Sequence, residues 1–521
     1  MPDTWVPPIH RIAIEDGRFI DSSTGETFVP RGVNMVRLEG GRDVVFSPAV
    51  YDRARFDDEF RGLAARGYNT VRLFLTSCDI GQDCLTEADV AGLNGEFLDV
   101  IAEVMQLARD HGLVLLLTSN DLPDGGGYRD RAHLDDGSIV GGYRNGEFLT
   151  ASGHAAMATF WDDLMAGLVE RQAALDVVLG WSILNEQWLF GADPPLSLDA
   201  GMATTATGVY DLANPDQKRA MVVDGIRSMI GDVASTIRSH DPDALVTMGF
   251  FSPQFPNASG IGGDWYVDTA PLVAESDLDF FDFHAYPGED IGLAEIAENF
   301  GISESRPVVM GEVGAFVHRF GTIDAGAYAV QEWIANSCAL GFDGWLYWAY
   351  DRLPADDATY GFTDSEGFLL DALAPVNQPD ACEPSLENPD LSAGATASAS
   401  RSLPDQIPEA AVDGNLDSIW GSGADAPQWI ELRFDEAVDV GSIVLHVAQF
   451  PAGPTRHVVE VRGADGTLTE VARFEQDTDG GDLLEATFDP ALIDVEAIRV
   501  TTLESPSWVA WSGIEIRRPP G

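Results

Sequence analysis

The chain has 521 residues, 45% of them hydrophobic and 22% charged, which is too long for one ordinary core and predicts two or more globular domains. Its 85 acidic residues outnumber the 30 basic ones and give a net charge of -55, and Lys218 is the single lysine. A surface this acidic repels phosphate groups, so nucleic acids and anionic membranes are excluded as favoured partners, and no apolar run of about 18 residues predicts a membrane span.

The N-terminal stretch predicts a hairpin that precedes the main fold. Residues 9–30 alternate apolar and polar side chains around DG and TG turn signals, as paired strands do. The first residues, MPDTWVPPIHR, lack the charged and apolar regions of a secretory signal. Either the protein stays inside the cell or a leader is missing from this sequence, and we favour the second interpretation.

Between residues 31 and 350, short apolar segments alternate with longer segments of helical spacing. The eight apolar segments, each predicted to be a strand, are 32–38, 69–75, 113–119, 177–184, 244–250, 280–286, 307–313 and 344–350. In 154–175 the apolar residues that recur on one helical face are Met157, Phe160, Trp161, Leu164 and Leu168. Repeated strand and helix units imply parallel pairing, and eight of them predict an α/β fold, a closed (β/α)8 TIM barrel.

Polar residues at the ends of these strands are the candidate site, because such barrels carry their chemistry at the carboxyl ends of the strands. They are Arg72, Asn120, Asn185, Glu186, His284, Tyr286, Glu312 and Trp348. Two carboxylates facing one pocket suit cleavage of a glycosidic bond, in which one donates a proton and the other attacks the anomeric carbon. Arg72 and Tyr286 can stabilise an ionised Glu312, which leaves Glu186 as the acid.

These motifs resemble family 5 of the glycoside hydrolases, the cellulase and mannanase family of clan A, over residues 10–370. The resemblance implies a retaining mechanism with Glu186 as acid/base and Glu312, in VVMGEVG, as nucleophile, and it implies no cofactor for catalysis. It also implies substrate-binding or supporting roles for Arg72, Asn185 at the sugar 2-hydroxyl, His284, Tyr286, and Trp348 beneath the attacked sugar.

The loop TSNDLPDGGGY, residues 118–128, favours mannan as the substrate. It carries Asn120 where many cellulases of the family have a histidine, and it resembles the Gly-Gly-Tyr loop of the family's β-mannanases but lacks their tryptophan after the asparagine. We therefore expect a secreted, monomeric endo-β-mannanase acting on a polysaccharide. A β-glucanase or an exo-acting β-glycosidase is the alternative, and a non-catalytic glycan-binding or adhesion protein is the alternative of another class.

Structural roles stay open for three of the candidates. His284 begins HAYP, which also makes an ordinary strand-to-turn transition. Trp348 lies in a run of aromatic residues, and aromatic-rich strands often belong to the core. Asn120 is equally well explained as a loop residue. The acidity of the chain has two explanations as well, a saline habitat or a genome that favours Asp and Arg over Lys.

The four cysteines predict two disulfides, Cys78 with Cys84 and Cys338 with Cys382, and buried free thiols are the alternative. Disulfides require an oxidising compartment, in agreement with secretion. The catalytic domain is expected over 1–372. The stretch 373–391, rich in Pro, Asn, Ser and Ala, is expected to be a linker, and 392–521 a second domain.

The second domain reads as a β-sandwich, because short strand-like runs follow one another with little helical pattern. The runs are 429–434, 442–450, 457–463, 485–489, 497–503 and 513–518. The segment EAAVDGNLDSIWGSGADAPQWIELRF and the ending WVAWSGIEIRR resemble the galactose-binding-like, discoidin-like sandwich that includes family 32 carbohydrate-binding modules.

This resemblance implies a structural calcium at Asp413, Ser418 and Glu515, and an Asx turn without an ion is the alternative. Candidate sugar-binding residues on the loops are His446, Arg456, Trp508 and Trp511, because aromatic faces stack on sugar rings and arginine binds hydroxyls, whereas Trp420 and Trp429 are expected in the core. Modules of this type also bind proteins or lipids, so the ligand stays open.

Overall fold

The computed structural model describes most of the chain, and it divides into two compact units. The described residues are 11–36, 38, 45–75, 85–87, 90–132, 139–251, 265–266, 268–288, 292–300, 302, 306–317, 319–320, 322–350, 359–386, 389–416, 418–463 and 466–519. One unit comprises Met1–Gly314 with Val330–Pro384, and the other Ala315–Ala329 with Ser385–Gly521.

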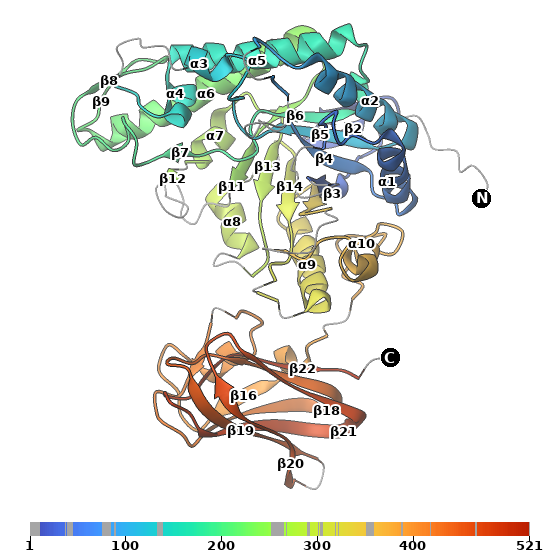
Figure 1. The fold of residues 1–521 in the computed structure, drawn as a ribbon, viewed down its shortest axis with the longest axis vertical. Helices are drawn as coiled ribbons and strands as arrows, with labels where there is room; N and C mark the ends of the chain where they lie inside the picture. The colour runs from blue at the N-terminus through green and yellow to red at the C-terminus, as the bar shows by residue number, and fades with distance from the viewer. Residues whose placement is uncertain are drawn as a thin grey trace. The chain divides into compact units, whose positions relative to one another are not determined.

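The first unit contains a closed parallel barrel (Figure 1). Its strand segments are β3 (Arg31–Met35), β4 (Thr70–Leu75), β5 (Val114–Ser119), β6 (Val178–Ser182), β10 (Val246–Thr247), β11 (Gly249–Phe251), β13 (Phe281–His284), β14 (Val308–Val313) and β15 (Gly344–Tyr347). β10 pairs with β6 at one end of the sheet and β11 pairs with β13 at the other, and only Met248 separates them. The predicted fifth strand is thus divided in two, and it closes the sheet into the predicted eight-stranded barrel.

Helices in the connections flank the barrel strands (Figure 1). They are α1 (Arg53–Ala65), α2 (Gly95–His111), α3 (Tyr128–Ala132), α4 (Tyr143–Leu149), α5 (Ala151–Glu170), α6 (Pro215–His240), α7 (Ala270–Glu275), α8 (Leu293–Phe300), α9 (Ile323–Cys338) and α10 (Phe368–Ala372). The five apolar residues predicted to share one face of 154–175 are all buried in α5. Among the described residues, no helix combines the length and the apolar character that crossing a membrane requires.

The predicted N-terminal hairpin is β1 (Ile12–Glu15) with β2 (Arg18–Asp21), and it closes the N-terminal end of the barrel. Ile12 and Phe19 are buried with apolar side chains from the starts of several barrel strands, and the ring of Phe19 meets that of Phe280 edge to face at 5.1 Å. Because apolar side chains fill this end, polar groups collect at the other. Two further antiparallel pairs lie outside the barrel sheet: β7 (Leu189–Phe190) with the distant β12 (Trp265–Tyr266), and the hairpin of β8 (Met202–Thr204) with β9 (Val209–Asp211).

The first residues of the predicted linker are fastened to the barrel unit. Cys382 forms the predicted disulfide with Cys338 at the end of α9. Arg31, at the start of β3, donates from Nη1 to the carbonyl of Pro379 at 2.9 Å and from Nη2 to that of Gln378 at 2.5 Å. The other predicted pair, Cys78 with Cys84, lies outside the described residues.

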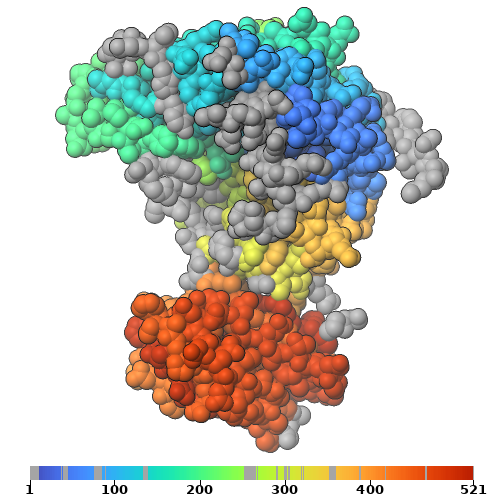
Figure 2. All heavy atoms as spheres, in the orientation of Figure 1, coloured from blue at the N-terminus to red at the C-terminus, as the bar shows by residue number. Residues whose placement is uncertain are grey.

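The second unit contains an antiparallel sandwich, and Figure 2 shows its atoms in orange to red. Its strands are β16 (Thr396–Ala399), β17 (Trp420–Gly421), β18 (Gln428–Val447), β19 (Gly453–Arg462), β20 (Leu468–Thr478), β21 (Leu483–Glu504) and β22 (Ala510–Arg517). Two pairs of predicted runs join into the long strands β18 and β21, because β-bulges bend each strand without ending it. β20 was missed.

Candidate active site

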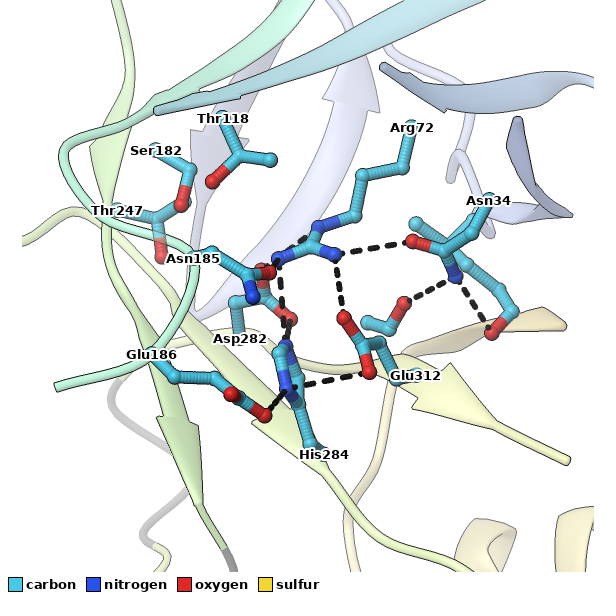
Figure 3. A network of polar contacts seen from close by, with 12 residues as sticks. Asn34, Arg72, Thr118, Ser182, Asn185, Glu186, Thr247, Asp282, His284 and Glu312 are labelled. Carbon is cyan, nitrogen blue, oxygen red and sulfur yellow. Dashed lines mark hydrogen bonds and ion pairs between the residues drawn. The ribbon is translucent and has the colours of Figure 1, made fainter. Parts of the chain in front are cut away.

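Six predicted site residues meet at the carboxyl ends of four barrel strands, and all of them except Tyr286 are labelled in Figure 3. Arg72 lies in β4, Asn185 and Glu186 follow β6, His284 ends β13 with Tyr286 two residues on, and Glu312 lies in β14. Parallel pairing brings these strand ends to one edge of the sheet, which explains why residues far apart in sequence lie together. The apolar run before Asn185 and Glu186 therefore delivers both side chains to the mouth of the barrel.

Arg72 is the centre of the hydrogen-bond network. It is fully buried, and its Nη1 donates to Glu312 Oε1 at 2.8 Å and to Asn34 Oδ1 at 3.0 Å. Its Nη2 donates to Asn185 Oδ1 at 2.7 Å, and its Nε lies 3.4 Å from Asp282 Oδ2. A buried guanidinium with this many acceptors holds the carboxylate of Glu312 and the amide of Asn185 in fixed orientations.

His284 lies between the two candidate carboxylates, as Figure 3 shows. Its Nδ1 is 2.7 Å from Glu186 Oε1 and 3.4 Å from Glu312 Oε2. One carboxylate oxygen of Glu186 and one of Glu312 lie within 4.8 Å of each other. This separation agrees with the roughly 5–5.5 Å of a retaining glycosidase and is shorter than the roughly 6.5–9.5 Å of an inverting one.

Burial and charge shift three pKa values in this cluster. Burial raises the pKa of Glu312, although the side chains of His284, Arg72 and Tyr286 oppose it. Burial, with the nearby carboxylate of Glu312, raises the pKa of Tyr286 well above its ordinary value, so its hydroxyl remains a donor to Glu312 Oε2 at 2.7 Å. Burial lowers the pKa of His284, but the nearby carboxylates of Glu312 and Glu186 have a larger opposite effect, so its pKa is raised overall.

A Tyr286→Phe variant is expected to move the acidic limb of the pH profile of kcat/KM to higher pH. As the predicted nucleophile, Glu312 would act only when ionised, so activity is expected to fall as pH falls through the pKa of Glu312. The tyrosine hydrogen bond lowers that pKa. Its removal therefore shifts the limb upward by about 0.5–1 pH unit. The matched control is Tyr210→Phe, since the hydroxyl of Tyr210 in β9 donates to Asp224 in α6 at 2.9 Å, away from the site. An equal shift in both variants would contradict the prediction.

Two residues of the network were missed by sequence reasoning, Asn34 and Asp282. Asn34 donates from Nδ2 to the carbonyl of Gly311 at 2.8 Å while its Oδ1 accepts from Arg72. Asp282 is fully buried between Arg72 and His284, with its Oδ1 3.7 Å from His284 Nε2. Each of them is a polar residue inside an otherwise apolar strand segment. Burial of a polar side chain is unfavourable unless it has a partner, so this pattern could have indicated both residues.

Gly311 makes room for Asp282 directly before Glu312. A β-carbon at position 311 would lie 1.6 Å from Asp282 Oδ1, which no side chain can do without displacing that carboxylate. The glycine is therefore required by close approach and not by its backbone angles.

Asn120 and Trp348 lie near the strand ends but outside this network. Asn120 directly follows β5 and is partly buried. Trp348 directly follows β15 and meets the ring of Phe74 edge to face at 5.7 Å, and the guanidinium carbon of Arg72 lies 4.8 Å from the centroid of that Phe74 ring. Its aromatic neighbours Trp345, Tyr347 and Tyr350 are buried. Trp348 is partly exposed and packs against the buried side chains of Val36, Phe74 and Ala349, so both the structural and the sugar-binding explanation remain for it.

Glu186, His284 and Glu312 also form a group with the donor types of a metal site. Two carboxylates and an imidazole can bind a transition metal. However, the guanidinium of Arg72 already donates to Glu312, and a cation there repels a second one. The arrangement fits proton transfer and nucleophilic attack better than metal binding.

Three of the four sugar-binding candidates in the second unit lie in strands and two of these are buried, which corrects the prediction that all four lie on loops. His446, in β18, and Trp511, in β22, are 4% and 1% exposed. Trp508 is 53% exposed, and Arg456, in β19, is partly exposed with its Nη2 3.8 Å from Glu504 Oε2. Trp420 is buried in the core as predicted, whereas Trp429 is only partly buried beneath the guanidinium of Arg499.

The predicted calcium ligands fall into two groups. Around Ser418 Oγ lie both carboxylate oxygens of Asp413 at 2.9 and 2.7 Å, the carbonyl of Ala410 at 3.0 Å and that of Asn415 at 2.8 Å. One hydroxyl proton cannot serve four acceptors, and an oxygen-only set of this kind suits calcium. Glu515 instead accepts from His446 Nε2 at 2.6 Å and from Arg517 Nη2 at 2.7 Å.

Comparison with known proteins gives a family for the sandwich and a fold for the barrel. Residues 394–516 match the F5/8 type C domain family, in agreement with the predicted discoidin-like module. No curated protein sequence matches the chain. An endo-1,4-β-mannanase from Rhizomucor miehei is similar in structure, with a TM-score of 0.50, 17% identity, and coverage of 71% of this chain and 100% of that one.

Two further solved structures are similar over parts of the chain. An exo-β-1,4-mannosidase from Opitutaceae bacterium strain TAV5 has a TM-score of 0.48 and 18% identity, over 71% of this chain and 62% of that one. A family 32 carbohydrate-binding module from C. perfringens, solved with galactose, has a TM-score of 0.22 and 20% identity, over 24% of this chain and 94% of that one. At these identities, the likeness to the endo-mannanase shows that the barrel fold is shared.

Proposed function

We propose that the chain is a retaining β-glycoside hydrolase that cleaves a polysaccharide, with β-mannan as the first substrate to test. The observation that carries the proposal is the pair Glu186 and Glu312, which face each other within 4.8 Å at the mouth of the barrel. The barrel fold shared with an endo-1,4-β-mannanase supports the class of reaction. The loop 118–128 supports mannan. β-Glucan hydrolysis and exo-acting cleavage are the alternatives.

The proposed reaction proceeds in two displacements. In the first, the carboxylate of Glu312 attacks the anomeric carbon while the carboxyl of Glu186 gives its proton to the leaving oxygen. The bond to the leaving sugar breaks and a glycosyl ester with Glu312 forms. In the second, ionised Glu186 takes a proton from water as the water oxygen attacks the same carbon, which releases Glu312 and returns the proton to Glu186.

The surrounding side chains prepare this chemistry. Arg72 and Tyr286 hold one oxygen each of the Glu312 carboxylate, so the nucleophile is oriented before the substrate arrives. The amide oxygen of Asn185 accepts from Arg72, and this orientation leaves the amide nitrogen to donate to the sugar 2-hydroxyl. Trp348 is proposed to pack against the attacked sugar, and its partial exposure beside the network supports this role.

The second unit is proposed to bind carbohydrate and so to raise the local concentration of substrate. Its match to the F5/8 type C domain supports a binding role. Trp508 and Arg456 are the candidates that remain partly or well exposed. Secretion is also proposed, because the disulfide of Cys338 with Cys382 needs an oxidising compartment to persist.

An assay of reducing-sugar release distinguishes a glycoside hydrolase from a non-catalytic glycan-binding protein. The full chain is incubated with mannan, glucomannan, cellulose, β-1,3-glucan and galactan, and a Glu312→Ala variant serves as the blank. Activity of the wild type on mannan, well above the blank, is the expected result, and the sizes of the early products separate internal from terminal attack. Equal values for both proteins on every polymer, with glycan binding retained, would favour the non-catalytic glycan-binding alternative.

A calcium ion is proposed at the oxygen cluster of Asp413 and Ser418. Calcium at 100 times its dissociation constant is expected to stabilise the protein by about 2.7 kcal/mol, read as a rise in the unfolding temperature that a chelator reverses. Asp413→Asn removes this response because it removes a charged ligand. The control Asp435→Asn, an exposed position, keeps it. Identical unfolding curves with calcium and with chelator would contradict the proposal.

A further inference from the structure

Arg144 is a buried arginine next to the candidate site that its sequence context does not single out. It is the second residue of the short helix α4 and is 1% exposed. α4 packs against α5, α6 and β7, in the connection between β5 and β6. Burying a guanidinium is costly unless strong acceptors surround it, so its partners indicate what it does.

The acceptors of Arg144 are on the loop that carries Glu186. Its Nη2 donates to the backbone carbonyl of Glu186 at 2.7 Å, and its Nε donates to the carbonyl of Trp188 at 3.1 Å. Its guanidinium carbon also lies 4.4 Å from the centroid of the Trp188 ring. One planar group therefore holds the backbone on both sides of Gln187.

The remaining partners of Arg144 fasten this loop to its neighbour. Its Nη1 forms an ion pair with Asp121, in the loop that follows β5. Glu147, one turn along α4, lies close enough to interact with the guanidinium, and burial raises the pKa of Glu147 to about 7. Burial lowers the pKa of Arg144 to about 10, so the guanidinium remains charged at neutral pH.

We propose that Arg144 is a positioning residue for the acid/base, holding the Glu186 backbone so that its carboxyl meets the leaving oxygen. The inference rests on the proposed glycosidase function and extends it to a residue that does not contact the reacting atoms. The backbone N–H groups on both sides of Glu186 are held by the barrel, since Asn185 donates to the carbonyl of Ser119 at 2.6 Å and Gln187 to that of Gly249 at 3.0 Å. Arg144 holds the carbonyls of Glu186 and Trp188 and so adds a second set of contacts to the same backbone. A displacement of about 1 Å is enough to cost roughly 10²-fold in rate.

The dependence of kcat/KM on the leaving group of the substrate tests this role. Aryl β-glycosides of the preferred sugar are compared, from nitrophenyl leaving groups that depart without help to phenyl groups that need a proton. Arg144→Met keeps the apolar stem and removes the donors. It is expected to lower kcat/KM by about 10²-fold on the phenyl glycoside and only a few-fold on the dinitrophenyl glycoside, because proton donation matters only for the former.

Arg306→Met is the matched control. Arg306 also donates to two backbone carbonyls, those of Ser276 and Leu278, and also lies over an aromatic ring, that of Phe281 at 5.5 Å. These contacts are at the opposite, N-terminal end of the barrel strands. We expect this variant to lower the unfolding temperature without changing the dependence on the leaving group.

Equal losses of Arg144→Met on all aryl glycosides, or no loss, would overturn the inference while leaving the proposed function intact. A wild type inactive on every glycoside would instead end the proposed function. If the methionine variant does not fold, Arg144→Lys keeps the charge and reaches one carbonyl, and the same selective loss is expected at smaller amplitude.

Discussion

Replacing Glu312 with alanine is expected to reduce kcat on the preferred polysaccharide by on the order of 10⁴-fold or more. The substitution removes the carboxylate that is proposed to attack the anomeric carbon, and the two groups bound to it, Tyr286 and Arg72, are donors that cannot replace it. The variant should still fold. Arg72 keeps a counter-charge in Asp282, 3.4 Å from its Nε, so the guanidinium is not left unpaired.

Two measurements separate this role from a structural one. A 2-deoxy-2-fluoro glycoside with a good leaving group is expected to label the wild type covalently, and mass spectrometry of peptides should place the sugar on Glu312. The anomeric configuration of the first product, read by proton NMR before it equilibrates, is expected to match that of the substrate. An inverted product, or a label on another residue, would remove Glu312 from the proposed role.

Glu186→Ala is expected to lose roughly 10²–10⁴-fold on substrates with poor leaving groups. The loss should be much smaller in the first step for dinitrophenyl glycosides, which need no proton. The second step remains slow because no base activates water, so the glycosyl ester with Glu312 is expected to accumulate. Dinitrophenol is then released in a rapid burst followed by a slow steady rate. Stopped-flow release of dinitrophenol measures this.

Azide distinguishes the two carboxylates by the product it forms. In Glu186→Ala, azide attacks the glycosyl ester from the face that water uses, and a β-glycosyl azide is expected. In Glu312→Ala, azide replaces the nucleophile and attacks the substrate directly, so an α-glycosyl azide is expected. The two variants are controls for each other. The same anomer from both, or no rescue of either, contradicts the assignment.

The barrel could be predicted from its strands because each is buried on both faces and therefore reads as an apolar run. The division of the fifth strand could not. Its segment ALVTMGF is continuously apolar, and the interruption at Met248 arises only because β10 pairs with β6 and β11 with β13. Several elements in the connections could not be predicted either, because α3, α4 and the hairpin β8–β9 have no long periodic pattern of apolar residues.

The site was predictable to the extent that its residues end strands. Glu186, His284 and Glu312 are polar groups at the ends of apolar runs, and the topology brings them together. Asn34 and Asp282 carried a weaker signal, a single polar residue within a strand. Arg144 carried none, because its role depends on backbone carbonyls of a distant loop that no sequence pattern reveals.

The sandwich shows that residue type alone does not predict which side chains are exposed. His446 and Trp511 were placed on loops, yet both are buried. The pairing of β18 with β22 changes register between His446 and Val447, opposite Gly513 and Trp511. A bulge of this kind changes which side chains face inward, and the change follows from the bend of the sheet and not from the local residues.

The contact beneath Gly311 limits which substitutions the floor of the site tolerates. Any other residue at position 311 adds a β-carbon 1.6 Å from an oxygen of Asp282. A larger residue there therefore requires the Asp282 carboxylate to move, and the Arg72 guanidinium then loses a neighbouring anion. Engineering a new specificity is thus expected to succeed more readily in the loops around the mouth than at this position.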